Sequence, residues 1–416
     1  MRKNIVNRAE KSSLTQAPHQ GVTLTAVGDI MLNRGVERYL RTKGYAYPFQ
    51  HVKDALQGSD LIFGNLELPL SPRGTPHPTK RLGFPAFRAD PRAVEGLLAA
   101  GFNVLSLANN HILDYGEEAL LDTIGVLRAN GIHPVGAGRN IREARTPAFL
   151  QIRGVKVAFL AYCSFYEASA HQAGTAPFEP ELMVEDIRAA RQAADVVVVS
   201  LHFGIEYSPC PLPRHRAIVH RLVNAGAALI LGHHPHLLQG IERYRNSLIA
   251  YSLGDFVFDT SDEDVMHKKI GGSRFGQITC RVFAPEHLRL DESIIFRCVL
   301  TAQGVEQVNL LPVRISLACQ PVLVEGAERG RILRRVDSLS ALLQDKTFTG
   351  VRELENAELE AQLRKRFQGR PLYLLTRLHR LRWLHIKLAL TTLRRKLLAY
   401  VGLAGSLVAL AGRLLQ

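Results

Sequence analysis

The segment Val22-Thr-Leu-Thr-Ala-Val-Gly-Asp29 joins a short apolar run to a glycine and a carboxylate. The apolar part predicts a buried β-strand, and the glycine and aspartate mark the point where the strand ends. The same order recurs at 61–63 with Gly64-Asn65-Leu66-Glu67, 103–107 with Asn109-Asn110-His111, 196–201 with His202, and 228–231 with Gly232-His-His-Pro-His236. The repetition indicates several strands that each end in a polar loop.

Segments with helical apolar spacing separate these strands. They are 33–43, 91–100, 117–129, 181–194 and 214–225. Strands that alternate with helices predict the α/β class, here a layered α/β sandwich with a largely parallel or mixed core sheet. Because ligands of open α/β sheets bind beyond the carboxyl ends of the strands, the polar loops are the candidate functional site.

Composition and charge predict three parts of the chain. Of its 416 residues, 46% are hydrophobic and 22% are charged, which is typical of globular proteins and excludes wholesale disorder. We expect a flexible lead over 1–20, an α/β domain over 21–325 that includes a β-rich stretch at 277–315, and a helical, basic appendage over 340–416. The charged, glycine-containing segment 325–335 marks the boundary of the domain.

The C-terminal segment 371–416 holds eight Lys or Arg residues and no Asp or Glu, in a chain of net charge +14. Its apolar run Leu397–Gly412 is shorter than the roughly 20 residues of a membrane span. We therefore expect this tail to lie on an anionic membrane surface. Nucleic acid is disfavoured, because Trp383 is the only aromatic residue between Tyr373 and Tyr400 and a stacking platform is missing.

Two further features bear on the compartment. The first twenty residues lack the apolar run of a secretory signal peptide. The five cysteines are odd in number and form no CxxC pair, which argues against a disulfide framework or a zinc ribbon. Both observations predict a cytoplasmic protein or one held at the periphery of a membrane.

The polar loops bring together carboxylates, a side-chain amide and imidazoles. That ligand mix favours a divalent ion such as Mn²⁺, Fe²⁺ or Zn²⁺ over Ca²⁺ or Mg²⁺, which prefer oxygen ligands. Each residue also has a simpler interpretation: an Asp or Asn after a strand is often a helix cap or Asx-turn, and a lone His202 is often a buried, hydrogen-bonded histidine. Three histidines within 233–236 are harder to explain in that way. The ordered set therefore predicts metal binding.

The motifs, taken in order, resemble those of the CapA family. They are GDIML, GNLE, NNH-x2-D-x-G, H-x-G-x-E-Y, GHHPH-x4-IE and YSLGDFVFD, and they cover about Val22–Asp259. Members of this family are linked to capsule and poly-γ-glutamate synthesis and are similar in fold to calcineurin-like metallophosphoesterases. The set is specific to the family and much less specific about the reaction.

The resemblance implies a role for individual residues of a metal-dependent hydrolase. The implied metal ligands are Asp29, Glu67, Asn110, His202, His234 and His236. Glu67 matches the bridging carboxylate by position. The implied catalytic residues are His111, which would act on the leaving group, and Asp114, which would orient the His111 ring. Asn65 and Glu206 are candidates for substrate binding, and His233 receives no role.

Three departures from the phosphoesterase pattern leave alternatives open. Met31 stands where a ligand histidine is usual, the bridging acid is Glu67 rather than an Asp directly after Gly64, and Asp255 stands where relatives usually show Asn. One or two metal ions are therefore expected. The protein is either a hydrolase acting on an anionic phosphoester or polymer of the envelope, or a non-catalytic component that binds polymer or capsule-synthesis subunits. Four basic residues lie between the polar loops that contain Glu67 and His111, and they either bind an anion or belong to a solvated surface loop: Arg73, Lys80, Arg81 and Arg88.

Overall fold

The computed structural model describes residues 21–78, 80, 85–260, 279, 283, 288–345, 354, 355 and 357. The chain divides into two compact units, residues 1–354 and 355–416. All helices and strands with defined bounds lie in the first unit. The expected lead over 1–20 and the basic tail over 371–416 lie outside the described residues.

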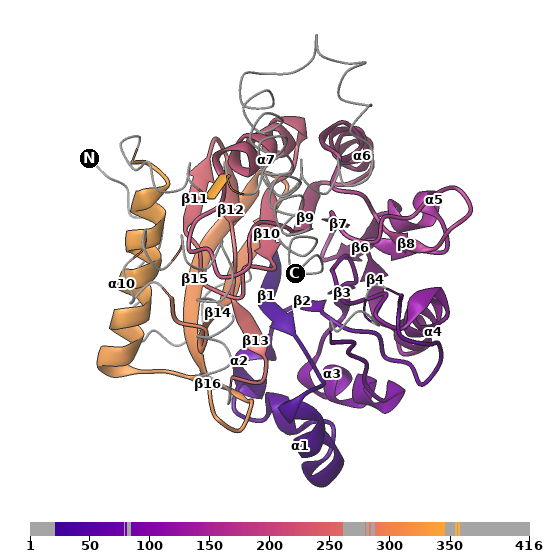
Figure 1. Ribbon diagram of the computed structural model, residues 1–416. Helices are drawn as coiled ribbons and strands as arrows, with labels where there is room; N and C mark the ends of the chain where they lie inside the picture. The colour runs from indigo at the N-terminus through magenta and orange to yellow at the C-terminus, as the bar shows by residue number, and fades with distance from the viewer. Residues whose placement is uncertain are drawn as a thin grey trace, which may run out of the picture. The chain divides into compact units, whose positions relative to one another are not determined.

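The first sheet has eight strands and is mixed in direction (Figure 1). Its order is β16-β15-β14-β1-β2-β3-β4, with β13 also paired to β1. The strands are β1 (Val22–Ile30), β2 (Leu61–Leu66), β3 (Val104–Ser106), β4 (His133–Val135), β13 (Asp255–Val257), β14 (Glu292–Thr301), β15 (Gly304–Ile315) and β16 (Pro321–Leu323). Strands β1 to β4 run parallel, whereas β14 joins β1 antiparallel. The carboxyl ends of the parallel strands therefore meet at one edge.

The second sheet has six strands in the order β11-β12-β10-β9-β7-β6. They are β6 (Ala148–Ile152), β7 (Val155–Cys163), β9 (Val196–His202), β10 (Leu229–His233), β11 (Ile241–Tyr244) and β12 (Ser247–Ala250). A separate pair is formed by β5 (Ala137–Gly138) and β8 (Gly174–Thr175). The four consecutive valines 196–199 of β9 are all buried. Successive side chains of a strand point to opposite faces, so both faces of β9 are covered.

The two sheets pack face to face, and helices cover their outer faces. Phe63 of the first sheet stacks on Phe159 of the second, with ring centroids 5.8 Å apart. The first sheet's outer cluster includes residues of α1 (Gly35–Lys43), α3 (Val94–Ala100) and α4 (Gly116–Ala129). The second sheet's outer cluster includes residues of α6 (Pro180–Ala193) and α7 (Pro213–Ala225). The expected layered α/β sandwich is confirmed. Short helical segments complete the unit: η1 (Tyr47–Phe49), α2 (Lys53–Leu56), η3 (Pro91–Ala93) and α5 (Ile141–Ala144).

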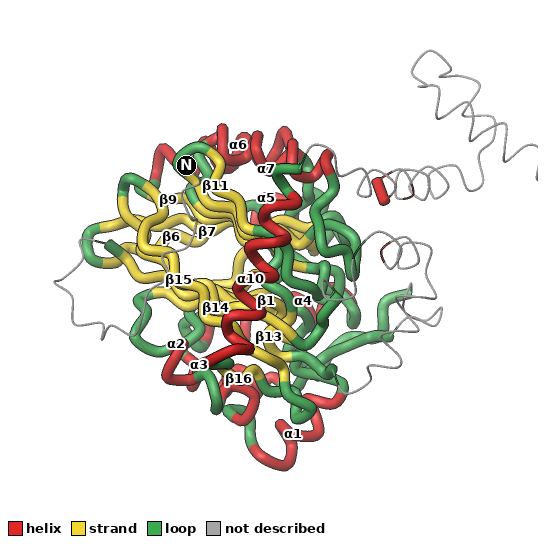
Figure 2. Tube along the Cα trace, turned by 90° about the vertical axis from the view of Figure 1, so that its left-hand side faces the viewer, coloured by secondary structure: helices red, strands yellow, loops and turns green. Residues whose placement is uncertain are grey.

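Helix α10 (Gly326–Leu342) crosses in front of both sheets (Figure 2). Ile332, Val336 and Leu339, spaced by four and three residues, are buried in the cluster between the sheets. Its arginine side chains add ion pairs, since Arg331 and Arg335 both pair with the buried Glu292. The packed unit therefore extends past residue 325, the end expected from composition, because an amphipathic helix follows directly.

Four cysteines fall within the described residues, and all are free and buried. They behave there as small core residues. Among the helices that the structure describes, none is long and apolar enough to cross a membrane.

Candidate metal centre

The close contact between β1 and β13 places two carboxylates side by side. Asp29 and Asp255 are partners in the register of this strand pair, and the Asp29 backbone N–H donates to the carbonyl oxygen of Gly254 at 3.1 Å. Gly28 permits this approach, because a Cβ atom there would lie 1.8 Å from that same oxygen. The glycine of the opening segment thus decides where the carboxylate of Asp29 lies.

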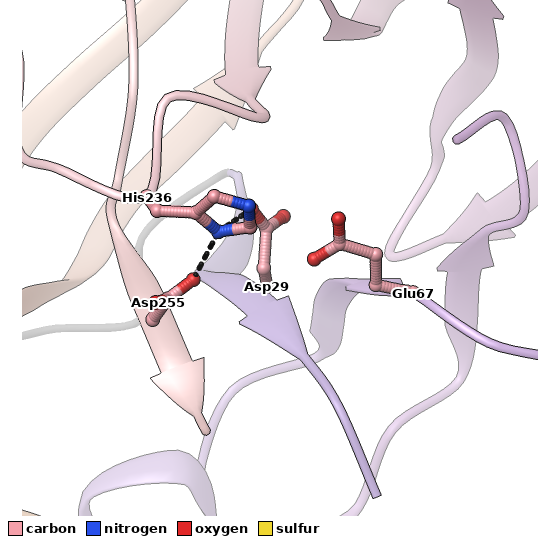
Figure 3. Close-up of side chains that lie close together, drawn as sticks. All are labelled: Asp29, Glu67, His236 and Asp255. Carbon is pink, nitrogen blue, oxygen red and sulfur yellow. Dashed lines mark hydrogen bonds and ion pairs between the residues drawn. The ribbon is translucent and has the colours of Figure 1, made fainter. Parts of the chain in front are cut away.

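Four buried side chains converge at this point (Figure 3): Asp29, Glu67, His236 and Asp255. One ligand atom from each lies within 4.8 Å of the other three. The His236 Nδ1–H donates to Asp255 Oδ1 at 2.8 Å and lies 3.8 Å from Asp29 Oδ2. Three carboxylates and an imidazole at this spacing form a ligand set suited to a divalent cation.

Glu67 is the most unusual member of this group. It is fully buried, and neither carboxylate oxygen accepts a hydrogen bond from any residue that the structure describes. Burial raises the pKa of Glu67 well above its ordinary value, and the nearby charge of Asp29 raises it further. A buried carboxylate without donors is costly unless a cation binds it. The donor set therefore fits a metal ion at Glu67.

A second set of ligand-type atoms surrounds His202, close to Glu67. His202 Nε2 is 2.9 Å from Asn110 Oδ1 and 3.7 Å from Glu67 Oε1. The His202 and His234 rings are 4.7 Å apart between centroids. Burial lowers the pKa of His202 well below its ordinary value and lowers that of His234 to about 4. Both imidazoles are therefore neutral near pH 7, which is the form that binds a metal.

The pKa of His236 shifts in the opposite direction to the pKa values of His202 and His234. Burial alone would lower the pKa of His236, but the charges of Asp255 and Glu67 raise it well above its ordinary value. Burial raises the pKa of Asp255 to about 6, against the opposing charge of His236. A proton on His236 balances the surrounding carboxylates here, which is the electrostatic task that a bound cation would take over.

Asp29 is held in place by three partners. Asn65 Nδ2 donates to its Oδ1 at 2.8 Å, His233 Nδ1 to the same oxygen at 3.1 Å, and the His234 backbone N–H to Oδ2 at 3.2 Å. Burial alone would raise the pKa of Asp29, but the His233 hydrogen bond and charge lower it below its ordinary value. Asn109 in turn donates to Asn65 Oδ1 at 3.2 Å. The carboxylate of Asp29 is thereby kept ionised and fixed in orientation.

The loop after β10 adopts an unusual backbone conformation. His234 has φ 97° and His236 has φ 56°, values that non-glycine residues rarely take. The loop is pinned by its neighbour, because the Tyr207 backbone N–H donates to the carbonyl oxygen of Pro235 at 2.8 Å. Strained conformations of this kind concentrate at functional sites, where the surrounding structure stabilises them.

A histidine, a carboxylate and a lysine lie beside Asn110. His111 Nδ1 is 2.8 Å from Asp114 Oδ2, and Lys80 Nζ is 2.8 Å from Asp114 Oδ1. The backbone N–H of Phe87 also donates to Asp114 Oδ2, at 2.8 Å. Burial lowers the pKa of His111, although Asp114 opposes the change. Asp114 therefore orients the His111 ring and fixes which nitrogen faces it.

Of the six expected metal ligands, Asp29, Glu67 and His236 lie together with Asp255 in one buried cluster. His202 lies 3.7 Å from Glu67 and contacts Asn110 and the His234 ring, while His111 pairs with Asp114. Asn65 is fully buried and hydrogen-bonded to Asp29, whereas Glu206 is exposed. The sequence reading assigned no site role to Asp255 or His233, and it left Lys80 between anion binding and a solvated loop. The signal for Asp255 was available in its position directly after Gly254 in an apolar segment. The contacts of His233 and Lys80 depend on side-chain directions that spacing does not reveal.

Met31 directly follows β1, at the position where the phosphoesterase pattern has a histidine. It is 1% exposed and packs in the apolar cluster of the first sheet's outer face. Its backbone N–H donates to the carbonyl oxygen of Val257 at 2.8 Å. Asp255 and Glu67 instead bring carboxylates to the Asp29 side of the cluster.

Comparisons with known proteins identify the family to which the sequence is similar. Residues 23–260 match the family model described as "Bacterial capsule synthesis protein PGA_cap". The chain is 37% identical over 249 residues to the capsule biosynthesis protein CapA of Bacillus anthracis, covering 58% of this chain and 61% of that one. It is 33% identical over 282 residues to the PGA biosynthesis protein CapA of Bacillus subtilis (strain 168), covering 64% of this chain and 73% of that one.

A solved structure of a phosphatase from Mycoplasma pneumoniae aligns with 71% of this chain and 94% of its own chain. The sequence identity is 13% and the TM-score is 0.45. At that level the structural likeness carries no inference about activity. The match to the Bacillus anthracis relative spans 61% of that protein's length.

Proposed function

Because the chain belongs to the bacterial capsule synthesis protein family PGA_cap, we propose that it is a divalent-metal-dependent hydrolase of the phosphoesterase type. Its substrate is an anionic phosphoester or polymer of the cell envelope, used in capsule or poly-γ-glutamate synthesis. The printed functions of the two Bacillus relatives, capsule biosynthesis and PGA biosynthesis, support this substrate class.

One observation carries the proposal, namely the state of the Glu67 carboxylate. Its two oxygens are buried without a hydrogen-bond donor among the described residues, and they point toward Asp29 and His236 (Figure 3). A side chain kept only for stability would have been paired or replaced by an apolar one. Asp29, His236 and Asp255 would hold one ion with Glu67, while Asn110, His202 and His234 stand where a second would bind.

The chemistry divides between the ion and the chain's own residues. A bound divalent ion lowers the pKa of water and neutralises charge on a phosphoryl oxygen. His111 in its protonated form donates a proton to the leaving oxygen from the ring nitrogen that does not face Asp114, and it becomes neutral. Asp114 holds the ring, and Lys80 holds Asp114 from its other oxygen. This arrangement keeps the imidazole fixed while its protonation state changes.

A non-catalytic role in assembly or export is the second candidate function. The observation in its favour is Met31, which puts a buried apolar side chain where the phosphoesterase pattern has a ligand. In that case the same fold and metal ion would bind polymer or a capsule-synthesis subunit without hydrolysis. Turnover decides between the two functions.

The test is hydrolysis of an aryl phosphate monoester and diester by protein reconstituted with Mn²⁺, Fe²⁺ or Zn²⁺. We expect metal-dependent turnover that His111→Ala reduces by about 100-fold or more, since acid–base groups contribute about 10² to 10⁴ in rate. The matched control is His220→Ala, whose ring stacks on Tyr244 away from the cluster. Metal-loaded protein with no turnover on either ester would favour the assembly role.

We also propose that the basic tail binds an anionic membrane surface, which keeps the protein at the membrane periphery. The supporting feature is the run of basic residues within 371–416. Replacing Arg394, Arg395 and Lys396 by Glu should weaken sedimentation with phosphatidylglycerol vesicles, since each basic residue contributes about 1 kcal/mol near such a surface. Full-length protein that ignores these vesicles would contradict the proposal.

A further inference from the structure

Arg34 lies beside the metal centre, directly before α1. Its guanidinium carbon is 5.7 Å from the centroid of the Phe87 ring and 5.5 Å from that of Phe258. Each of these rings also contacts a histidine of the site: Phe87 lies 5.0 Å from His111 and Phe258 lies 5.2 Å from His236. The guanidinium is therefore positioned between the proton-transfer side and the ligand side of the centre.

The backbone of Arg34 is held in a rare conformation. Its φ of 59° and ψ of −134° lie outside the regions that side-chain-bearing residues favour. The neighbours on both sides fix it there, because Asn33 Nδ2 donates to the carbonyl oxygen of Arg88 and the Gly35 backbone N–H donates to Asp259 Oδ2 at 2.9 Å. Strain that the surrounding structure enforces is a mark of a functional position.

The charge of Arg34 acts on the site: burial raises the pKa of Asp255, and Arg34 is among the charges that lower it. Within the part of the chain that the structure describes, its guanidinium forms no ion pair and donates no hydrogen bond; its contacts there are the two aromatic faces. Stacking on a ring face leaves the N–H groups in the guanidinium plane available to a ligand. The surface arginines nearby differ: Arg92 is paired with Asp90, and Arg41 with Glu37.

We propose that Arg34 is the anion-binding residue of this centre and grips the oxygens of a phosphoryl group as the substrate enters. The proposal rests on the function proposed above. A guanidinium offers two parallel N–H donors that match two oxygens of a phosphate. The rings of Phe87 and Phe258 keep it aimed, and the preset backbone means that little order is lost on binding.

The experiment measures binding of inorganic phosphate to Mn²⁺-loaded protein by titration calorimetry, with metal content determined on every sample. Arg34→Ala should weaken phosphate binding by about 10- to 100-fold, the range for a charge-assisted hydrogen bond. The phosphate affinity of Arg34→Lys should fall between those of the wild type and Arg34→Ala, because lysine keeps the charge but loses the two parallel N–H donors of the guanidinium. Arg38→Ala is the matched control: Arg38 lies in α1, four residues after Arg34, also stacks on a ring, that of Tyr39, and is exposed.

A second variant separates binding from folding. Glycine tolerates a positive φ, so Arg34→Gly should melt no lower than the wild type and still bind phosphate weakly. Glutarate serves as the comparison anion and should not compete with phosphate. Glutarate binding that disappears in Arg34→Ala would overturn the phosphoryl assignment in favour of a carboxylate.

Metal content and phosphate affinity distinguish failure of the proposed function from failure of the Arg34 anion site. Wild-type protein that takes up no metal contradicts the proposed function, and the anion site falls with it. Full metal content with phosphate affinity within twofold of wild type in both Arg34→Ala and Arg34→Gly contradicts the anion site alone.

Discussion

Replacing Glu67 by leucine should make the metal-free protein more stable and should abolish its metal binding. Glu67 is fully buried, and its two oxygens meet no hydrogen-bond donor among the described residues. Leaving a buried polar group unpaired costs about 1–3 kcal/mol, and leucine removes that cost at similar volume. We therefore expect the free energy of unfolding to rise by about 1–3 kcal/mol in the presence of a chelator.

The assay is urea unfolding of wild type and variant, first with chelator and then with saturating Mn²⁺. Metal stabilises the wild type by binding the folded state alone, so the order of stability should reverse when the ion is added. The control is Glu242→Leu. Glu242 is also buried, but it accepts hydrogen bonds from Arg216, His220 and Tyr251. Its loss should destabilise by roughly 1–3 kcal/mol whether or not metal is present, because it leaves the buried Tyr251 hydroxyl without its acceptor.

The pH dependence of the Glu67 effect has a definite sign. Burial and Asp29 raise the pKa of Glu67 in the folded state, so the protonated carboxyl is favoured there. Its contribution to folding is best below the ordinary value of 4.5 and is lost as the pH rises toward the folded-state pKa. The advantage of Glu67→Leu should therefore grow with pH above about 4.5. A metal-free variant that is less stable than wild type at pH 7 would refute the reasoning.

Three further outcomes follow from the same geometry. Asp114→Asn should reduce kcat by about 10- to 100-fold with metal content unchanged, since residues that orient a functional imidazole contribute in that range. Burial alone would raise the pKa of Glu242, but hydrogen bonds from Arg216 and its other donors lower it. The ionised Glu242 therefore stabilises the fold above about pH 4.5, and this stabilisation is lost as the pH falls through the lower folded-state pKa. Glu242→Gln should remove this pH dependence on the acid side of a curve of unfolding free energy against pH. Gly28→Ala should destabilise by about 1–3 kcal/mol and reduce metal uptake, because its Cβ would meet the Gly254 carbonyl oxygen, and thermal melting with metal analysis checks both effects.

The layered fold and the meeting point of the site were predictable because each motif follows an apolar run. A strand that ends in Gly28-Asp29 and another that ends in His202 leave their polar residues at sheet edges, whatever the pairing order. The sheet order was not predictable from the same pattern. Strands β1 and β13 are separated by more than two hundred residues, and their register alone places Asp255 beside Asp29.

The remaining contacts could not be predicted from the sequence, because they depend on side-chain directions and on distant parts of the chain. Lys80 is half of an ion pair with the buried Asp114, yet its sequence neighbourhood reads as a basic loop. The conformation of Arg34 depends on partners at Arg88 and Asp259, which lie far along the chain. Helix α10 has an amphipathic spacing, but composition alone did not assign it to the domain on which it packs.

The metal content of the purified protein tests the central claim most directly. Elemental mass spectrometry should find at least one divalent transition-metal ion per chain after reconstitution. The ion should be lost in a His234→Ala/His236→Ala double variant that still folds, because that variant removes the His236 imidazole from the cluster with Glu67 and the His234 imidazole beside His202. Wild-type protein that binds no Mn²⁺, Fe²⁺ or Zn²⁺ after reconstitution would contradict the account, and the buried carboxylate would then need another explanation.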